Sequence, residues 1–271
     1  MTAAGKVDLG LKFLQEVFGL KALHLGLFAE GVPRTVEGIH RAQEEYTRAL
    51  IGLIPAGVRS VLDVGSGLGG TSRAMAEAGL SPEGLSPDPH HGEQFARTCG
   101  KAVPFHLTTF EAFSPGRTYD CLLFSESPQY IAKDAFFPKC LELTAPGGHL
   151  VLAEFFQAAA GGPYDKCFFE DDFVDRAGRS GFRVEHRRDV TEEVLPTLEL
   201  GGTFLKYGRR MFDFSTDAFR RRRPLLWRLV RLPFGRKIDH VRHLLNDRLP
   251  LWLNKDLFRK TTRYVMYRMS R

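Results

Sequence analysis

Residues 61–71 of the chain are Val61-Leu62-Asp63-Val64-Gly65-Ser66-Gly67-Leu68-Gly69-Gly70-Thr71. Four apolar or acidic residues lead into four glycines, and a helix-compatible stretch from 71 to 78 follows. Glycine lacks a Cβ atom, so the backbone can turn sharply here and lie close to a bound ligand. The N-terminus of the next helix then offers unpaired N–H groups to a polar ligand. The stretch therefore predicts the ligand-binding turn of a doubly wound α/β domain.

Two classes of nucleotide cofactor use such a turn. The glycines at 65, 67 and 70 fit G-x-G-x-x-G, the dinucleotide pattern, which is weak evidence by itself. That interpretation expects an Asp or Glu about 20 residues later, bound to a ribose hydroxyl. The tip of the second predicted strand carries Ser86 instead, with Asp88 slightly later. The dinucleotide interpretation therefore lacks its acidic partner at the expected place.

The other interpretation combines Asp63 with the glycines at 65, 67 and 69 in an acidic-x-G-x-G-x-G pattern. This pattern resembles motif I of class I S-adenosylmethionine (SAM)-dependent methyltransferases. Residues 119–127 resemble the fourth strand of these enzymes, and residues 143–152, with a Pro-Gly-Gly turn, resemble the approach to their fifth strand. The order and spacing match the family over about residues 20–200. The resemblance implies a Rossmann-like α/β fold with a doubly wound, seven-stranded, mostly parallel sheet whose last strand is antiparallel.

The hydrophobic pattern outside the motifs agrees with this fold. It predicts helices at 8–20, 35–53, 71–79, 90–99, 134–143 and 168–179, and strands at 60–64, 83–85, 103–107, 119–124, 149–155, 182–186 and 262–269. Alternating strands and helices imply a parallel sheet with helices on both faces. About 70 residues between Asp189 and Lys260 are too many for a plain connection. They predict a helical cap inserted before the last strand.

This pattern divides the chain into three parts. Residues 1–57 are predicted to form N-terminal helices that cover the active site, and residues 58–190 with 261–271 to form the SAM-binding core. Residues 191–260 are predicted to form a basic helical cap, or substrate lid. From Gly201 to the C-terminus the chain has 19 Lys and Arg against 5 Asp and Glu, a charge of +14, so the remainder carries −8 of the total of +6. This asymmetry indicates that the C-terminal part meets an anionic or interfacial partner.

The remaining composition narrows the setting. The four cysteines show no C-x-x-C pairing, which is typical of reduced thiols in a cytoplasmic protein. No stretch approaches the ~20 apolar residues of a membrane span, and residues 1–10 lack a signal-peptide pattern. His90 and His91 have no companion ligand at metal-binding spacing, so they are expected to start a helix facing solvent, and no metal is predicted.

The resemblance assigns the SAM contacts by position. Motif I and the segments that follow the next strands supply Asp63, Gly65, Ser66, Gly67, Gly69, Ser86, Thr109, Phe110 and Ser125. Ser86 takes the place where most relatives have an acidic ribose ligand, and a hydroxyl bonds ribose less strongly than a carboxylate does. Thr109 and Phe110 fall where relatives contact adenine, and Phe110 is expected to stack on the base. Ser125 is expected near the methionine end of SAM.

The acceptor site is expected around Glu126. Residues 125–130 resemble the segment after the fourth strand in tocopherol and sterol C-methyltransferases, where an acid faces the acceptor. Glu126 is therefore a candidate to accept a proton or to stabilise a developing cation, and the alternative is a loop carboxylate bonded to backbone amides. Tyr130 replaces the histidine of the family. His24 lies in a segment that resembles the one closing over SAM and substrate, although a histidine among leucines is more often structural.

Three interpretations of the basic cap stay open. It is a lid with a solvated basic face, an interfacial cap that contacts a membrane and admits a lipid-like acceptor, or a nucleic-acid-binding surface. Nucleic acid is disfavoured, because Ser125-Glu126-Ser127-Pro128 stands where nucleic-acid amino-methyltransferases have N/D-P-P-Y/F/W. No recognised RNA-binding module is visible in the sequence either.

The sequence therefore predicts a cytoplasmic SAM-dependent methyltransferase acting on a small, hydrophobic or amphipathic molecule at a carbon, oxygen or nitrogen atom. The alternatives are a polar-amine N-methyltransferase, an RNA methyltransferase that uses the basic cap, and a SAM-binding protein without catalysis. Peripheral contact of the cap with a membrane is kept as a hypothesis, and the sequence does not indicate an oligomeric state.

Overall fold

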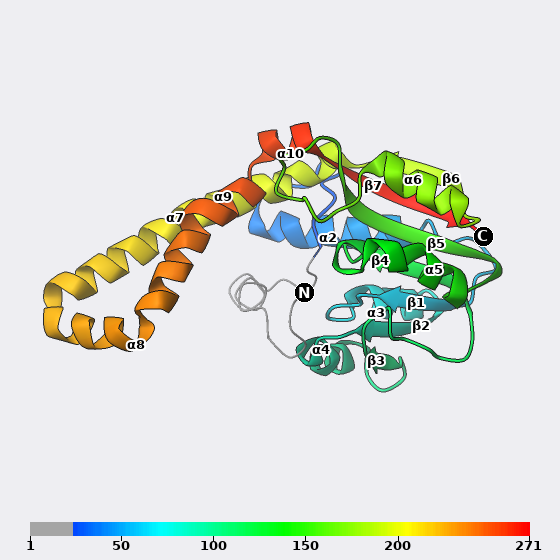
Figure 1. Ribbon diagram of the computed structural model, residues 1–271, viewed down its shortest axis with the longest axis horizontal. Helices are drawn as coiled ribbons and strands as arrows, with labels where there is room; N and C mark the ends of the chain where they lie inside the picture. Colours follow the sequence, from blue (N-terminus) through cyan, green and yellow to red (C-terminus); the bar gives the residue numbers. More distant parts are fainter. Residues whose placement is uncertain (1–23) are drawn as a thin grey trace.

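The computed structural model of the protein describes residues 24–271, so the helix predicted at 8–20 lies outside the described residues. Its core is a seven-stranded sheet with the strand order β3-β2-β1-β4-β5-β7-β6 (Figure 1). The strands are β1 (Ser60–Val64), β2 (Ser81–Ser86), β3 (Phe105–Leu107), β4 (Tyr119–Ser125), β5 (Thr144–Gln157), β6 (Arg183–Asp189) and β7 (Thr262–Ser270). All seven predicted strands are present, with ends displaced by a few residues.

The sheet is mostly parallel, as predicted. β1 lies between β2 and β4 and is parallel to both, and the pairs β2–β3 and β4–β5 are parallel as well. β7 runs antiparallel to β5 and β6, between which it lies. The chain order reverses direction in the sheet between β1 and β4. In an open α/β sheet, ligands bind at the carboxyl ends of the strands beside this reversal.

Helices cover both faces of the sheet. Alternate side chains of β4 point to opposite sides, so Leu122 and Phe124 join one buried cluster and Cys121 and Leu123 join the other. α5 (Lys133–Leu143) and α6 (Glu170–Arg179) pack in the first cluster. The second contains side chains of α2 (Val36–Ile51), α3 (Gly70–Glu77), the beginning of α7 (Thr191–Arg222) and α10 (Lys255–Thr261). The doubly wound architecture is therefore confirmed.

The largest difference from the predicted strand boundaries is at β5. It begins at Thr144 rather than at His149, and the Pro-Gly-Gly turn lies inside it. Its register with β4 shifts between Tyr119 and Cys121, where Gly147 has a φ of 74°. A positive φ costs glycine nothing, so the chain forms a bulge there and resumes pairing.

The segment between β6 and β7 is helical, as predicted, but most of it does not lie over the sheet. α7 runs away from the core and α8 (Pro224–His243) returns, followed by a short π-helix (Leu244–Arg248) and α9 (Leu249–Trp252). Figure 1 shows α7 and α8 as a long hairpin projecting from the sheet, with its turn farthest from the core. Only its base packs on the core, through Val194, Leu195 and Leu198. α4 (Pro89–Cys99) covers the end of the sheet near β2 and β3.

Candidate functional site

The glycine-rich turn follows β1 at its carboxyl end. Gly65, Gly67 and Gly69 have φ angles of 79°, 52° and 86°, in the left-handed region that favours glycine. A Cβ at Gly65 would come within 2.5 Å of the Cβ of Ser127. The first helical hydrogen bond of α3 runs from Arg73 N to Gly69 O, so the helix itself leaves the preceding N–H groups unused. Within the turn, the amides of Gly65 and Ser66 donate to the carbonyl of Leu85, and the amide of Gly69 donates to that of Ser66. The donors left for a polar ligand are therefore the first amides of α3.

Asp63, in β1, stabilises this turn through a buried hydrogen bond. Its side chain is 1% exposed and accepts a 2.6 Å hydrogen bond from the hydroxyl of Ser72, in the first turns of α3. Burial raises the pKa of Asp63 to about 6, and the bond from Ser72 partly opposes that rise. The acid thus ties β1 to α3 across the glycines, which is the loop-stabilising role that the resemblance implies for it.

The tip of β2 holds a hydroxyl where most relatives have an acid. Ser86 is buried, and its Oγ lies 3.0 Å from Nδ1 of His91 and accepts a bond from the amide of Asp88. The expectation that His91 faces solvent is therefore wrong, because its ring is hydrogen-bonded to the buried hydroxyl of Ser86. Ser66, next to the turn, is also buried, and its Oγ has no hydrogen-bond partner among residues 24–271.

The two residues expected near adenine differ in their surroundings. Thr109 is exposed, and its hydroxyl accepts a 3.3 Å bond from the amide of Ala112. Phe110 is 3% exposed and lies in the core, edge-on to Phe124 with 5.5 Å between ring centroids and 6.3 Å from Phe136. The structure thus uses the Phe110 ring for core packing, which leaves no open face on it for stacking.

Glu126 follows the last residue of β4 and precedes Ser127, which contacts the glycine turn. It has a φ of 54° and is the only non-glycine residue with a positive φ in the described part of the chain. Such a conformation costs about 1–3 kcal/mol and persists only where the surroundings impose it, commonly at functional sites. The next residue, Ser127, donates a 2.5 Å bond to the carbonyl of Val64 and contacts Gly65. The predicted cofactor turn and acceptor loop are therefore in direct contact.

One carboxylate oxygen of Glu126 is held by the protein. Oε1 accepts 2.7 Å hydrogen bonds from the amide of Leu25 and from the hydroxyl of Tyr264 in β7. The Tyr264 hydroxyl also lies 3.2 Å from that of Tyr46 in α2, which lies 2.8 Å from Oγ of Ser125. Oε2 forms no hydrogen bond with any described residue. The network thus orients the carboxylate and leaves one oxygen available to a ligand.

The surroundings of Glu126 change the pKa of its carboxyl group. Burial raises its pKa to about 7, while the bonds from Leu25 and Tyr264 oppose the rise. A general base works best with a pKa near the operating pH. The bond from the amide of Leu25 is the loop contact that the alternative interpretation expects, while the raised pKa and the positive φ are common at functional sites.

Glu154 is a second buried carboxyl group that the sequence analysis missed. It is 1% exposed, with Oε1 accepting from the amide of Phe155 and Oε2 from that of Gln129. Gln129 in turn donates through Nε2 to the carbonyl of Glu126. Burial raises the pKa of Glu154 to about 8, and Glu126 adds to the rise. The signal for it in the sequence is a single charged residue within the otherwise apolar stretch 150–156, most of which lies in the predicted strand 149–155.

His24 has a structural environment. Its ring stacks on Tyr46, with 4.0 Å between centroids, and Nδ1 donates to the carbonyl of Leu25 at 2.9 Å. Burial lowers its pKa to about 4, so the ring is neutral near pH 7. The structure places it beside the two residues that hold the Glu126 network, Leu25 and Tyr46. No hydrogen bond joins its ring to Glu126.

Tyr130 is not brought to the Glu126 network. It ends the 3₁₀ turn η1 (Pro128–Tyr130) and is 75% exposed. Ser125 does join the network, through Tyr46. The structure therefore brings together Glu126, Ser125 and the His24 segment with the glycine turn, and leaves Tyr130 at the surface.

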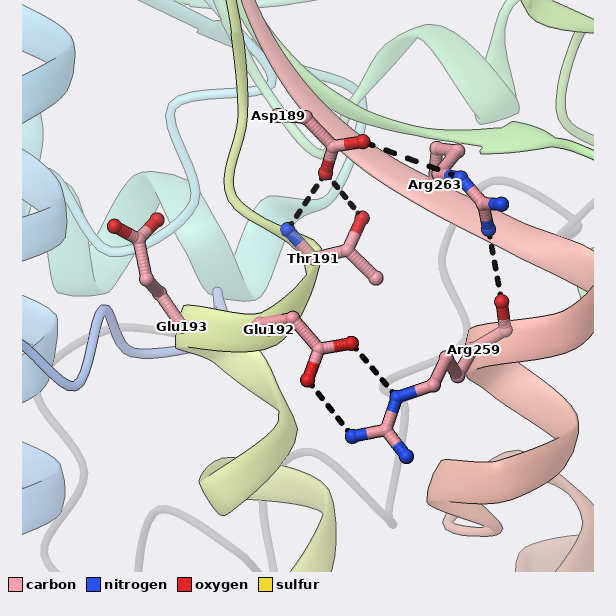
Figure 2. A pocket seen from close by; sticks show the side chains of 6 residues that line it. All are labelled: Asp189, Thr191, Glu192, Glu193, Arg259 and Arg263. Atoms are coloured by element: carbon pink, nitrogen blue, oxygen red, sulfur yellow. Dashed lines mark hydrogen bonds and ion pairs between the residues drawn. The ribbon is translucent and has the colours of Figure 1, made fainter.

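A hollow of about 470 Å³ lies elsewhere, at the base of the hairpin. Figure 2 shows Arg259 bonded to Glu192 and Arg263 facing Asp189. Arg259 makes two 2.7 Å bonds to Glu192, and Arg263 lies 4.0 Å from Asp189. It is beside β6, at the opposite edge of the sheet from β3. No group of three or more His, Cys, Asp or Glu side chains among residues 24–271 is placed to hold a metal ion.

No known family profile matches the chain, and no curated protein matches its sequence. Solved structures do match in fold. A geranyl diphosphate C-methyltransferase from Streptomyces coelicolor, solved with Mg²⁺, geranyl diphosphate and S-adenosyl-L-homocysteine, matches at a TM-score of 0.67 and 14% identity, over 99% of this chain and 94% of that one. The cyclopropane synthase MmaA2 from Mycobacterium tuberculosis matches at 0.69 and 12%, over 98% and 94%.

A third structure broadens the range of activities on this fold. The [4+2]-cyclase SpnF matches at a TM-score of 0.67 and 16% identity, over 97% of this chain and 93% of that one. At these identities the comparisons show the fold and not the reaction. Together with the strand order and the glycine turn, they show that this chain has the fold of the class I SAM-dependent methyltransferases.

Proposed function

We propose that the protein is a SAM-dependent methyltransferase that modifies a small, amphipathic molecule. The observation that carries this proposal is the contact between Gly65 and Ser127, which joins the glycine turn to the loop of Glu126. One ligand on the turn and another at the free oxygen of Glu126 would therefore lie next to each other. Methyl transfer needs this proximity, because the reaction is an in-line displacement.

The proposed cofactor site consists of the turn and the strand tips around it. The first amides of α3, before Arg73, would hold the amino-acid end of SAM, Ser86 would bind its ribose, and Thr109 would lie near adenine. Bound SAM supplies an electrophilic methyl group on a sulfonium. The chain would align the acceptor and exclude water. As the bond from the acceptor to the methyl group forms, the S–CH₃ bond would break and S-adenosyl-L-homocysteine would leave, and Glu126 would take the proton that the acceptor loses.

The chemistry around Glu126 favours an acceptor with a large apolar part. Tyr264 is edge-on to Phe155, with ring centroids 4.7 Å apart, and Phe155 stacks on Tyr164 at 4.6 Å. Tyr164 contacts Trp252 in α9, so aromatic rings run from the site to the base of the hairpin. Tyr264, Phe155 and Tyr164 are buried and make the surroundings of Glu126 apolar, whereas Trp252 is 46% exposed and is the ring of this run that a ligand can reach. An isoprenoid-like or other apolar acceptor is proposed on this ground.

The test is Glu126→Gln, assayed with methyl-labelled SAM and a fractionated cell extract. Gln keeps an oxygen for Leu25 and Tyr264 but cannot take a proton, so turnover should fall by about 10²–10⁴-fold while SAM affinity changes little. Label is expected in the organic-soluble fraction. Equal losses of turnover and of SAM affinity would show that Glu126 only supports the loop. Label in RNA or in a polar amine would overturn the acceptor class.

The match to a protein named as a [4+2]-cyclase shows that this fold carries reactions other than methyl transfer, so the second candidate is a SAM-binding protein without methyl transfer. It predicts binding of S-adenosyl-L-homocysteine by the wild-type protein with no label transferred to any fraction. It also predicts that Glu126→Gln leaves cofactor binding unchanged. Transfer of label to one fraction, lost in the Glu126→Gln variant, rejects this candidate.

A further inference from the structure

We propose that the turn of the α7–α8 hairpin docks on an anionic phospholipid surface. The hairpin tip, defined here as residues 220–237, contains eight Lys and Arg and no Asp or Glu. Figure 1 shows this part of the hairpin farthest from the sheet. The proposal does not depend on the proposed function, because it concerns a surface distant from the glycine turn.

Five of the eight Lys and Arg side chains of the tip are arginines without an ion-pair partner in the described part of the chain. Near the core, the hairpin's acids are paired: Glu192 with Arg259, Glu193 with Arg188, and Glu199 with Lys255. At the tip, Arg220 pairs with Asp217 and Arg231 with Asp239. The other tip arginines have no ion-pair partner among residues 24–271; they are Arg221, Arg222, Arg223, Arg228 and Arg236. Unpaired cations on an exposed surface complement an anionic partner.

Apolar side chains stand among these cations. Leu225, Leu229 and Leu232 are spaced i, i+4 and i+7, which puts them on one side of α8. They are 73%, 63% and 84% exposed. Trp227 is half-buried and packs against Phe219 of α7, with 6.1 Å between ring centroids. The leucines therefore form the outer side of the helix, where a solvated helix would carry polar residues.

This combination selects a lipid surface over other partners. A nucleic acid would use the arginines but would leave the three leucines in water. A second copy of the chain would bring two strongly basic tips together, with mutual repulsion. A bilayer interface accommodates both the leucines and the arginines. The leucines would be buried at the boundary between headgroups and acyl chains, and the arginines would pair with lipid phosphates. No helix in the described part of the chain is long and apolar enough to cross a membrane, so the hairpin would lie on the surface.

The experiment is co-sedimentation of the full chain with vesicles of phosphatidylcholine, with and without phosphatidylglycerol. Two tip variants are compared with wild type: Arg221→Glu/Arg222→Glu/Arg223→Glu, and Leu225→Ser/Leu229→Ser/Leu232→Ser. The control Arg97→Glu/Lys101→Glu/Arg179→Glu makes the same change of charge at three exposed positions on the core. Thermal unfolding checks that each variant folds, and Leu232→Ser alone, at the most exposed leucine, replaces the triple variant if that unfolds.

Wild type and control should bind the phosphatidylglycerol vesicles, with binding that falls as salt rises, and should bind phosphatidylcholine at least about tenfold more weakly. Each tip triple should lose about tenfold or more in partitioning, and Leu232→Ser a smaller amount. Equal binding by wild type and both tip variants would overturn the proposal, as would the absence of wild-type binding.

Two further outcomes would name another partner. Transfer RNA that binds wild type and the leucine variant equally, but not the arginine variant, would assign the tip to a nucleic acid. A concentration-dependent dimer of wild type that the leucine variant lacks, without vesicle binding, would assign it to a second copy. Either result would overturn the proposed lipid contact.

Discussion

The hydroxyl of Tyr264 donates a 2.7 Å hydrogen bond to Oε1 of Glu126, although the two residues are 138 positions apart in the chain. β5 lies between β4 and β7, and β7 runs antiparallel to β5. This arrangement places the Tyr264 hydroxyl of β7 next to Glu126, which follows β4. A hydrogen bond to the charged form of a carboxyl group lowers its pKa. Tyr264 therefore holds the acid in place and limits the rise of its pKa.

Tyr264→Phe should consequently shift the pH dependence of turnover upward. Without the hydroxyl, the pKa of Glu126 rises from its value of about 7, so a smaller fraction is ionised at neutral pH. We expect turnover near pH 7 to fall about tenfold and to recover partly at higher pH, since a hydrogen bond to a charged group is worth about 1.5–3 kcal/mol. A kcat profile from pH 6 to 10 measures this shift.

The matched control is Tyr267→Phe, in the same strand. The Tyr267 hydroxyl also bonds a carboxylate, that of Glu170, in the cluster on the other face of the sheet. This variant should leave the midpoint of the profile unchanged. An equal shift in both variants would mean that the effect comes from loss of stability.

Gly67→Val should abolish binding of S-adenosyl-L-homocysteine. Gly67 has a φ of 52°, a conformation that a β-branched residue adopts only with strain, and the added side chain would occupy the turn. Isothermal titration calorimetry measures the affinity. Gly116→Val is the control, because Gly116 also has a positive φ, 70°, but an added Cβ would have no atom within 4 Å. It therefore introduces similar backbone strain away from the turn. Retained binding by Gly67→Val would reject the motif I assignment.

Ser86→Asp should strengthen cofactor binding by about three- to tenfold, since a charged acceptor bonds a ribose hydroxyl about twice as strongly as a neutral one. His91, 3.0 Å from Ser86 Oγ, is placed to donate to the new carboxylate as well. Ser81→Asp, at the exposed start of the same strand, is the control. Unchanged affinity in Ser86→Asp, measured by calorimetry, would show that the tip of β2 does not contact the ribose.

Glu154→Gln should flatten the pH dependence of stability. The pKa of Glu154 is about 8 in the folded protein, against an ordinary value of 4.5. Between these values the folded state binds more protons than the unfolded chain, so wild-type stability falls as pH rises toward 8. The loss is on the order of a few kcal/mol, and Gln carries no charge that produces it. Urea unfolding at pH 6 and pH 9 compares the two proteins.

Glu142→Gln is the control for this measurement, because Glu142 is exposed and pairs with Lys139 at the surface. It should keep the wild-type dependence on pH. The same slope in Glu154→Gln as in wild type would mean that Glu154 is not the group that titrates. Glu126 contributes to the slope in the same direction, so a partial flattening is the expected result.

Much of the cofactor turn could be predicted because its determinants are local. The glycines at 65, 67 and 69 adopt positive φ angles that few other residues tolerate, and an apolar strand precedes them. Alternating strand and helix patterns likewise predict the doubly wound sheet, since each element buries one face against its neighbours. Phe110 could not be placed in the same way, because its position in the sequence does not distinguish an aromatic ring packed in the core from one that faces a ligand.

The sequence by itself determined the order of the elements, the glycine turn and the excess of positive charge near the C-terminus. Only the tertiary structure decided which distant groups meet at Glu126: Leu25, Tyr46, Glu154 and Tyr264 come from four separate segments. It also decided that the basic helices project as a hairpin instead of lying over the sheet (Figure 1). The physical reason is that local patterns fix backbone conformation, whereas pairing between distant strands and helices depends on packing of the whole chain.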